Sequence, residues 1–487
     1  MNRRLFTLAI ALIAAVLPLA AAADDDLPKA AAQALRRAAD YLNDQVSCEG
    51  GYLWHYSADL TRREGENAAK ATQVWIQPPG TPAVGQTLLT AYERTGDKHY
   101  LDLARRTGMA LVRGQLHSGG WDYRIEFDKA LRDRVAYRVD GPIQNAKQFN
   151  VSTYDDNTTQ SALRFLMALD ERLEFQDKAI HECVEYALAK LIEAQYPNGA
   201  WPQRYSTPHD PAKFPVKKAS YPETWSRTFE NKKYLDHYTF NDSAMLDCVD
   251  VLFIAERIYQ KPEYRAAALK AGDFLLLAQL PEPQPTWAQQ YDADMHPAWA
   301  RKFEPPSVTG GESQVVMLML LDFYRRTGEK RFLEPIPRAL EWFKRSQLAK
   351  GTYARFYELQ TNKPLYFTKK YELTYDDSDM PTHYGFKVGS RIERVEKGYS
   401  ELTSKPWQAS TPPKPPKYAK PSASQEAEVR QVIAALDSQG RWLVTGTLSE
   451  AELAKGDEPI IRTDVFMKNA DVLSRYLAGG RGSDGGK

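Results

Sequence analysis

The sequence predicts an all-α protein, an α/α toroid (barrel) built from repeated αα-hairpins. The first observation is a unit of helix, short turn, helix and loop that repeats with a period of roughly 65–90 residues. The second is the alternation of almost wholly apolar helices with helices that carry a single apolar stripe. The third is a loop after each helix pair that contains an aromatic residue and, in most repeats, glycine. The loop aromatics are Trp54, Trp121, Trp201, Trp287, Tyr353 and Trp442.

The helices of each pair differ in their apolar pattern. The segments "SALRFLMAL", "DCVDVLFIAERI" and "QVVMLMLLDFY" are apolar on most faces, whereas "YLDLARRTGMALVRGQ" and "CVEYALAKLIEAQ" are amphipathic. Turns such as "RTGDKHY" and "RTGEKRF" separate the two kinds. Stacked hairpins could form an open solenoid or a closed ring, and a row of all-round apolar helices favours the ring. In that arrangement the loops and the starts of the inner helices share one rim, which forms a cleft.

The two ends of the chain differ in composition from the repeats. Residues 1–23 have two arginines, an apolar run and small residues ending in Ala23, which is typical of a secretory signal peptide. Residues 24–410 are the predicted toroid, and 411–422 form a connector rich in Pro and Lys. A helical hairpin packing on the toroid is expected over 423–478, and a disordered tail over 479–487. We therefore expect a secreted or periplasmic protein.

Composition excludes several classes of function. The 64 Lys+Arg and 63 Asp+Glu give a net charge of +1, which does not favour nucleic-acid binding. No stretch after the signal is long and apolar enough to span a membrane. Three cysteines allow at most one disulfide, and Cys183 and Cys248 lie in apolar helical patterns typical of buried thiols. Neither a CxxC nor an HExxH motif is present, so a zinc site has no support.

Acidic residues gather where two inner helices begin. One helix starts with "TYDDNTTQSALRF", which contains Asp155 and Asp156, and the next starts with "YTFNDSAM", which contains Asn241 and Asp242. A helix start needs one capping residue, and we expect Asn241 to supply it for the second helix. The remaining carboxylates exceed what capping requires. Hard oxygen ligands from neighbouring helices suit Ca²⁺, although each Asp could instead cap its helix.

Basic and aromatic residues alternate with these acids on the predicted rim. Arg204 follows the loop residue Trp201, Arg301 precedes an inner helix, and Arg355 and Lys363 lie in "YARFYELQTNKPLYF". Arginines can hold carboxylates by paired hydrogen bonds, and the aromatic faces can stack on sugar rings. The alternative is that the loop aromatics form a packing layer beneath the loops.

Four of these motifs, "NGAWPQRY", "FNDSAM", "KFEPPSVTGGES" and "ARFYELQTNKPLYF", resemble the family 10 polysaccharide lyases, which are pectate lyases. The resemblance covers about residues 84–370. It implies an exported enzyme that cleaves α-1,4-linked polygalacturonate by Ca²⁺-dependent β-elimination and leaves a 4,5-unsaturated product. It implies that Arg301 is the catalytic base and that Arg355 binds substrate. It also implies that three carboxylates help to bind Ca²⁺, those of Asp155, Asp156 and Asp242.

We assign substrate binding as well to Trp201, Arg204, Lys363 and Glu304, and we expect a monomer that acts on an acidic polysaccharide. The chain departs from the family by an insertion at 206–237 and by its C-terminal extension.

Two other functions stay open at this point. A glycoside hydrolase on the same toroid would need a pair of carboxylates, for which Asp242 with Glu304 or Glu312 are candidates. A non-catalytic sugar-binding protein of the cell envelope would use the aromatics and arginines but not the acidic cluster.

Overall fold

A computed structural model describes residues 27–229, 234–349, 351–408, 418–448 and 457–481. The predicted signal peptide (1–23) and most of the predicted connector (411–422) lie outside these ranges. None of the described helices is long and apolar enough to cross a lipid bilayer.

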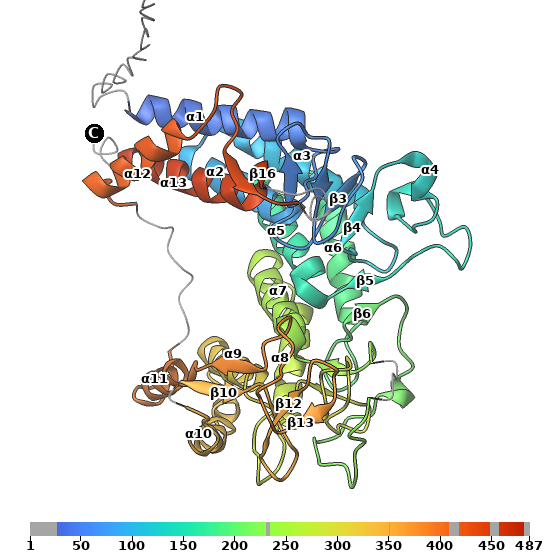
Figure 1. Ribbon diagram of the computed structural model, residues 1–487. Coiled ribbons are helices and arrows are strands. Elements are labelled where there is room, and N and C mark those ends of the chain that lie inside the picture. Colours follow the sequence, from blue (N-terminus) through green and yellow to red (C-terminus); the bar gives the residue numbers. More distant parts are fainter. Residues whose placement is uncertain (1–26, 230–233, 350, 409–417, 449–456, 482–487) are drawn as a thin grey trace, which may run out of the picture.

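The described chain consists mainly of paired helices arranged in an inner and an outer row (Figure 1). The inner row is α2 (Thr81–Thr95), α5 (Thr158–Arg172), α7 (Ala244–Tyr259), α9 (Glu312–Thr327), α11 (Ile392–Thr403) and α13 (Thr463–Arg481). The outer row is α1 (Leu27–Tyr41), α3 (Lys98–Gly114), α6 (Lys178–Glu193), α8 (Pro262–Leu277), α10 (Ile336–Arg345) and α12 (Ala423–Ala434). The prediction of an all-α toroid built from αα-hairpins is confirmed.

Local sequence explains where these helices begin and end. The side chain of Asp97 accepts the His99 N–H at the start of α3, and Asp177 caps α6 in the same way. Helices α2 and α9 end at Gly96 and Gly328, which adopt the left-handed conformation that glycine favours. These two glycines belong to the repeated turn RTG, so the repeated sequence produces a repeated helix end.

Short helical segments and strands complete the described elements. The single turns are η2 (Leu42–Val46), α4 (Lys129–Arg132), η3 (Arg138–Asp140), η4 (Asp155–Asn157), η5 (Pro211–Lys213), η6 (Asn241–Ser243) and η7 (Lys330–Phe332). The strands of the first half are β1 (His55–Ser57), β2 (Arg63–Glu64), β3 (Gln73–Trp75), β4 (Arg124–Glu126), β5 (Ser152–Thr153), β6 (Arg204–Tyr205), β7 (Tyr238–Thr239) and β8 (Gln290–Tyr291). Those of the second half are β9 (Val308–Thr309), β10 (Thr352–Ala354), β11 (Phe356–Tyr357), β12 (Pro364–Phe367), β13 (Leu373–Thr374), β14 (Lys387–Gly389), β15 (Leu443–Gly446) and β16 (Glu458–Arg462).

Adjacent repeats are joined at the rim by short antiparallel strand pairs. The strand just before an inner helix pairs with the loop strand of the same or next repeat, in the pairs β3–β4, β5–β6, β7–β8 and β9–β11. Each pair continues into one more backbone hydrogen bond, such as Tyr154 N–H to Gln203 O and Phe240 N–H to Gln289 O, both about 2.9 Å or shorter. These ladders hold the start of each inner helix at a fixed height on the rim.

The C-terminal hairpin lies at the N-terminal end of the helix rows. Helix α13 packs against α1 and α2, and strand β16 pairs with β1 and β15 in one small sheet. In Figure 1 the helices follow an arc from α13 and α2 through α5 and α7 to α9 and α11. The division into the predicted domains stays a prediction, but the start and end of the chain share one body of packed helices.

The predicted disordered tail begins too early in the sequence. Helix α13 continues to Arg481, so residues 479–481 are helical rather than disordered. The reason is packing, because Gly479 is buried against the backbone of Ala419, where any larger side chain would collide. Residues 482–487 lie outside the described ranges.

Candidate active site

Two equivalent turns present acidic side chains at the rim. In η4, Asp156 and Asn157 have φ values of 51° and 56°, and in η6, Asp242 and Ser243 have φ values of 47° and 60°. Non-glycine residues seldom adopt this left-handed conformation, and residues that do are enriched at functional sites. The two turns contact each other. The repeat therefore places Asp156 and Asp242 at matching positions on neighbouring inner helices.

Asp155, Asp156 and Asp242 form an acidic cluster. One carboxylate oxygen from each lies within 4.8 Å of the others. Burial, and next the charges of Asp156 and Asp242, raise the pKa of Asp155 to about 7. Burial, and next the charge of Asp156, also raise the pKa of Asp242. The structure thus brings together the three carboxylates that the sequence singled out, at a spacing where they repel one another.

Asn241 does not cap the helix, contrary to the prediction. Its side-chain N–H donates to Asp242 Oδ2 at 2.6 Å, and the position before the first residue of α7 is Ser243. The helix is preceded by a 3₁₀ turn, which moves Asn241 out of capping range. Its buried amide instead orients the carboxylate of Asp242.

Arg301 is paired with Glu304 on the loop before α9. Its Nε donates to Glu304 Oε2 at 2.9 Å and its second guanidinium nitrogen to Oε1 at 2.6 Å. Burial opposes the charge of Arg301, but its hydrogen bond with Glu304 prevails and raises the pKa of the guanidinium. Burial likewise opposes the charge of Glu304, and Arg301 prevails and lowers the pKa of that carboxyl.

Glu304 has no oxygen free for a substrate, so its predicted role in substrate binding is wrong. It is 1% exposed, and besides Arg301 it accepts from Gln289 Nε2 at 2.7 Å and from the Tyr384 hydroxyl at 2.9 Å. Its carboxylate fixes the orientation of Arg301 instead.

Arg355 lies on the adjacent loop and is held by three groups. It donates to Glu312 Oε1 at 2.8 Å and to Gly385 O at 2.8 Å, and its guanidinium stands 4.8 Å from the centre of the Tyr384 ring. The ring of Tyr384 also lies 5.6 Å from Arg301, so one tyrosine contacts both arginines. Asp242, Glu312 and Arg355 line a cavity of about 370 Å³.

The other predicted substrate residues have different surroundings. Arg204 stands 5.6 Å over the ring of Tyr123, whose hydroxyl donates to Asp156 Oδ2 at 2.8 Å, so Arg204 lies one side chain away from the acidic cluster. Lys363 lies in the turn between β11 and β12 with its Nζ 5.2 Å from the Tyr375 ring. None of its contacts in the described chain is with the acidic cluster.

Trp201 is a packing residue rather than a sugar-stacking one, which corrects the prediction. It is 1% exposed, and its indole N–H donates to Leu191 O at 2.8 Å. Trp121 and Trp287 make the same bond, to Leu111 O and Leu275 O, each at 2.8 Å. Trp121, Trp201 and Trp287 therefore tie their loops to the end of the preceding outer helix, which agrees with the alternative of a packing layer beneath the loops.

Tyr123 and Tyr384 are site residues that the sequence did not single out. Tyr123 stands two residues after a loop tryptophan, and the equivalent positions in the following repeats are Gln203, Gln289 and Arg355. That spacing could have identified Tyr123. Tyr384 lies in a segment without a regular hydrophobic pattern. Only the structure shows that this segment lies at the candidate site.

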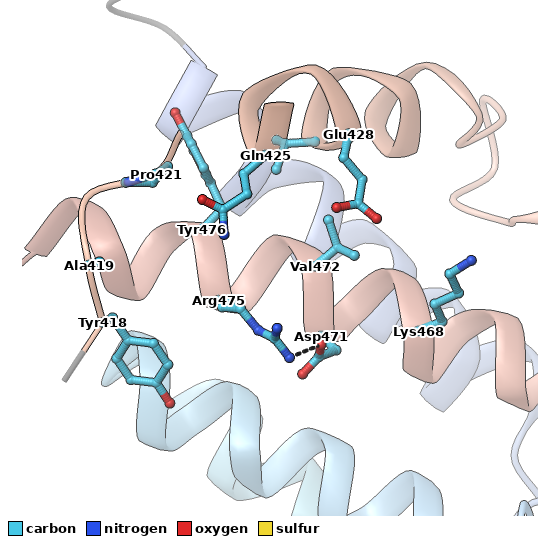
Figure 2. A pocket seen from close by; sticks show the side chains of 11 residues that line it. Tyr418, Ala419, Pro421, Gln425, Glu428, Lys468, Asp471, Val472, Arg475 and Tyr476 are labelled. Carbon is cyan, nitrogen blue, oxygen red and sulfur yellow. Dashed lines mark hydrogen bonds and ion pairs between the residues drawn. The ribbon is translucent and has the colours of Figure 1, made fainter. Parts of the chain in front are cut away.

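A larger cavity of about 450 Å³ lies elsewhere, between α12, α13 and residues 418–421 (Figure 2). Two of its charged groups are already paired with each other, because Asp471 accepts from Arg475 at 2.7 Å, and Asp471 also accepts from Arg94 at 2.6 Å. No residue of the rim lines this cavity. The acidic cluster and its two arginines are therefore the better candidate for chemistry.

Comparison with known proteins supports this choice. Residues 128–354 match the family model for pectic acid lyase. The matched segment contains the acidic cluster and Arg301 and ends one residue before Arg355. The resemblance to pectate lyases noted in the sequence is confirmed by this match, which identifies a polysaccharide lyase domain. No curated protein matches the chain.

Among solved structures, the chain is similar to a family 10 polysaccharide lyase from Cellvibrio cellulosa, at 19% identity over 66% of this chain and 97% of that one, with a TM-score of 0.46. A mutant of that lyase in complex with trigalacturonic acid gives 20% identity over 67% and 98%, with a TM-score of 0.44. A D-mannose isomerase gives 14% identity over 69% and 74%, with a TM-score of 0.40.

Proposed function

We propose that this chain, whose residues 128–354 form a pectic acid lyase domain, is an exported pectate lyase that cleaves polygalacturonate by Ca²⁺-dependent β-elimination. The observation that carries the proposal is a cluster of three carboxylates within 4.8 Å, next to two fixed arginines. We expect a secreted or periplasmic monomer that acts on α-1,4-linked chains and leaves a 4,5-unsaturated end.

The residues of the acidic cluster fit a calcium ion. All three donors are carboxylate oxygens, which Ca²⁺ prefers, and they come from two turns whose separation is set by the rim ladders. The raised pKa of Asp155 and of Asp242 reflects charge that no protein cation neutralises fully. A bound Ca²⁺ would withdraw electron density from the substrate carboxylate, which acidifies the proton on the adjacent carbon.

The arginines supply binding and orientation in this proposal. The guanidinium of Arg355 is held by Glu312, Gly385 O and the Tyr384 ring, so it can receive a uronate carboxylate with little loss of side-chain freedom. Arg204, one side chain away from Asp156, can bind a second carboxylate or a ring hydroxyl.

We assign the abstraction of the C5 proton to Arg301. Without ligand, the pairing with Glu304 keeps this guanidinium protonated, so it must lose a proton before it can act. A divalent cation held by the acidic cluster would add positive charge beside Arg301 and so would favour that loss. Glu304 and Tyr384 keep the side chain oriented while its protonation changes.

The hydrolase alternative that pairs Asp242 with Glu304 is less well supported. An inverting or retaining hydrolase needs a carboxylic acid whose pKa is raised, so that it can protonate the leaving oxygen. Arg301 lowers the pKa of Glu304 against the effect of burial, and both oxygens of Glu304 are occupied. Glu304 cannot be the acid partner of Asp242.

The test is the ultraviolet absorbance of polygalacturonate incubated with the purified protein, with added Ca²⁺ and separately with a chelator. A Ca²⁺-dependent rise in absorbance reports the new C4=C5 double bond and supports elimination. The variant Asp242→Asn should strongly reduce the rise, because it removes one of the three negative charges that would hold the cation. New reducing ends without a rise in absorbance would establish hydrolysis instead. The absence of both signals would contradict catalysis on this polymer.

A further inference from the structure

The cavity beside the acidic cluster extends beyond the residues used in the proposed reaction. Its volume is about 370 Å³, and it runs from Asp242 and Glu312 past Arg355 to the junction of β14 and α11. At that junction Ser390 and Arg391 form its wall. These residues lie outside the segment that matches the pectic acid lyase family.

Arg391 is a cation whose guanidinium has no protein partner within the described chain. It is exposed, and only its backbone N–H is engaged, by Gln314 Oε1. Arg355, which lines the same cavity, is instead paired with Glu312 and with Gly385 O. The free guanidinium is therefore available to an anion that enters the cavity.

The backbone that carries Arg391 is held firmly at the rim. The side chain of Gln314 is buried, and its Nε2 donates to Gly310 O at 2.6 Å and to Gly389 O at 3.2 Å. Strand β14 pairs with β10 at Gly389, which ties the same segment to the loop of Arg355. The position of Arg391 relative to Arg355 is thus set by two short strands and one buried amide.

A second observation shows what else the cavity can bind. Glu312 is 9% exposed, and its Oε2 is buried with no hydrogen-bond partner, although Oε1 is bound by Arg355. A buried carboxylate oxygen without a donor is costly, so a ligand that donates a hydrogen bond there gains affinity. A ligand for this cavity should carry both hydroxyl donors and an anionic group.

We propose that Arg391 forms an additional uronate subsite of the cleft, which binds the carboxylate of a sugar residue further along the polymer than the one held by Arg355. In this subsite a ring hydroxyl donates to Glu312 Oε2. The inference rests on the proposed function for its choice of ligand. It makes Arg391 a specificity residue that favours long, unesterified chains over short ones.

The experiment compares Arg391→Gln with the matched control Arg394→Gln. Arg394 is an exposed arginine on α11; it does not line this cavity but an adjoining one that shares Ser243 and Val315 with it. Elimination rates are measured on trigalacturonate, hexagalacturonate and methyl-esterified hexagalacturonate, all with saturating Ca²⁺. Equilibrium binding of hexagalacturonate is measured separately by calorimetry in the presence of a chelator.

Arg391→Gln should raise KM for the hexamer about tenfold and leave kcat unchanged, because it removes a binding contact and no reacting group. The trimer, the esterified hexamer and the Arg394→Gln control should change less than twofold. Equal KM values for wild type and Arg391→Gln on the hexamer would overturn the subsite. So would an equal loss with Arg394→Gln, which would show a general effect of surface charge.

Failure of the proposed function gives a different pattern. If wild type forms no unsaturated product but binds the hexamer, and Arg391→Gln weakens that binding, the subsite stands and the lyase assignment fails. If wild type does not bind the hexamer at all, the subsite is overturned as well.

Discussion

At the scale of the residue, the site depends on charges that are buried close to charges of the same sign. Asp155 is the clearest case, since burial and two neighbouring aspartates raise its pKa to about 7. A protonated Asp155 is therefore stable in the folded protein at a pH where the unfolded chain would have lost that proton. In the proposed function, Ca²⁺ binding would compete with protonation of this side chain.

Asp155→Asn should stabilise the protein when no Ca²⁺ is present. The stabilising effect of protonating Asp155 is complete below the unfolded pKa, near 4, and is lost as the pH rises through about 7. In chelator at pH 8 the Asn variant should melt a few degrees above wild type, and at pH 4 the two should melt together. Differential scanning calorimetry measures this. A lower melting temperature for the variant at pH 8 would contradict the placement of the carboxylate.

Arg301→Lys tests the proposed base. General base catalysis contributes typically about 10²–10⁴-fold, so kcat should fall by that order while KM changes little. Because the pKa of Arg301 is raised, its neutral fraction grows as the pH rises, and wild-type kcat/KM should increase about tenfold per pH unit over the alkaline range. Initial rates at saturating Ca²⁺ give both quantities. A wild-type plateau near neutral pH, or a variant within tenfold of wild type, would assign the proton transfer to another group.

At the scale of the element, several repeats use the same few contacts to build their rim loops. An indole N–H closes the loop onto the end of an outer helix, and a hydroxyl at the start of an inner helix bonds the loop backbone. In the α5 repeat the hydroxyl of Thr159 accepts from Trp121 N–H at 3.1 Å, and in the α9 repeat Ser313 accepts from Trp287 N–H at 3.1 Å. These contacts with the helix ends fix the backbone of the loops. The loop side chains that do not take part in them can vary between repeats.

Trp201→Phe separates packing from substrate contact. The change leaves Leu191 O without its donor, which should cost about 1–3 kcal/mol of unfolding free energy. Activity per folded molecule should stay within about twofold, because the ring does not face the cleft. Chemical denaturation and steady-state kinetics measure the two effects, and Trp407→Phe, at an exposed tryptophan, is the control. A raised KM with unchanged stability would instead support the predicted stacking of Trp201 on a sugar ring.

At the scale of the whole molecule, the first and the last described helices pack against each other. Helix α13 packs on α1 and α2, and the sheet β15–β16–β1–β2 joins residues near the N-terminus to residues near the C-terminus. Fixing these ends limits the movement of the first repeat, on which the later rim ladders are built.

Leu473→Ala should destabilise the fold without altering the chemistry. Leu473 is fully buried in α13, and truncation of such a leucine typically costs about 2–5 kcal/mol. The midpoint of urea unfolding should fall, while the Ca²⁺ dependence and kcat/KM of the folded protein stay as in wild type. The exposed Lys468→Ala on the same helix is the control. Loss of activity without loss of stability would show that α13 acts on the cleft directly.

The sequence by itself determined the helix pairs, their alternation and the identity of the acidic cluster. The helix pairs recur in each repeat, and the acidic residues recur at the same place in two adjacent repeats, so periodicity and spacing indicate both. The same logic places Asp155 and Asp156 beside Asp242, because equivalent turns of adjacent repeats must meet on a shared rim.

Only the tertiary structure decided which polar groups are free. Trp201, Glu304 and Asn241 have the residue types of site residues, but their hydrogen bonds go to Leu191 O, Arg301 and Asp242. Tyr384 and Arg391 come from a segment without periodicity, which reaches the cleft by pairing β14 with β10. The physical reason is that side-chain partners distant in sequence set burial and charge, and no local pattern records them.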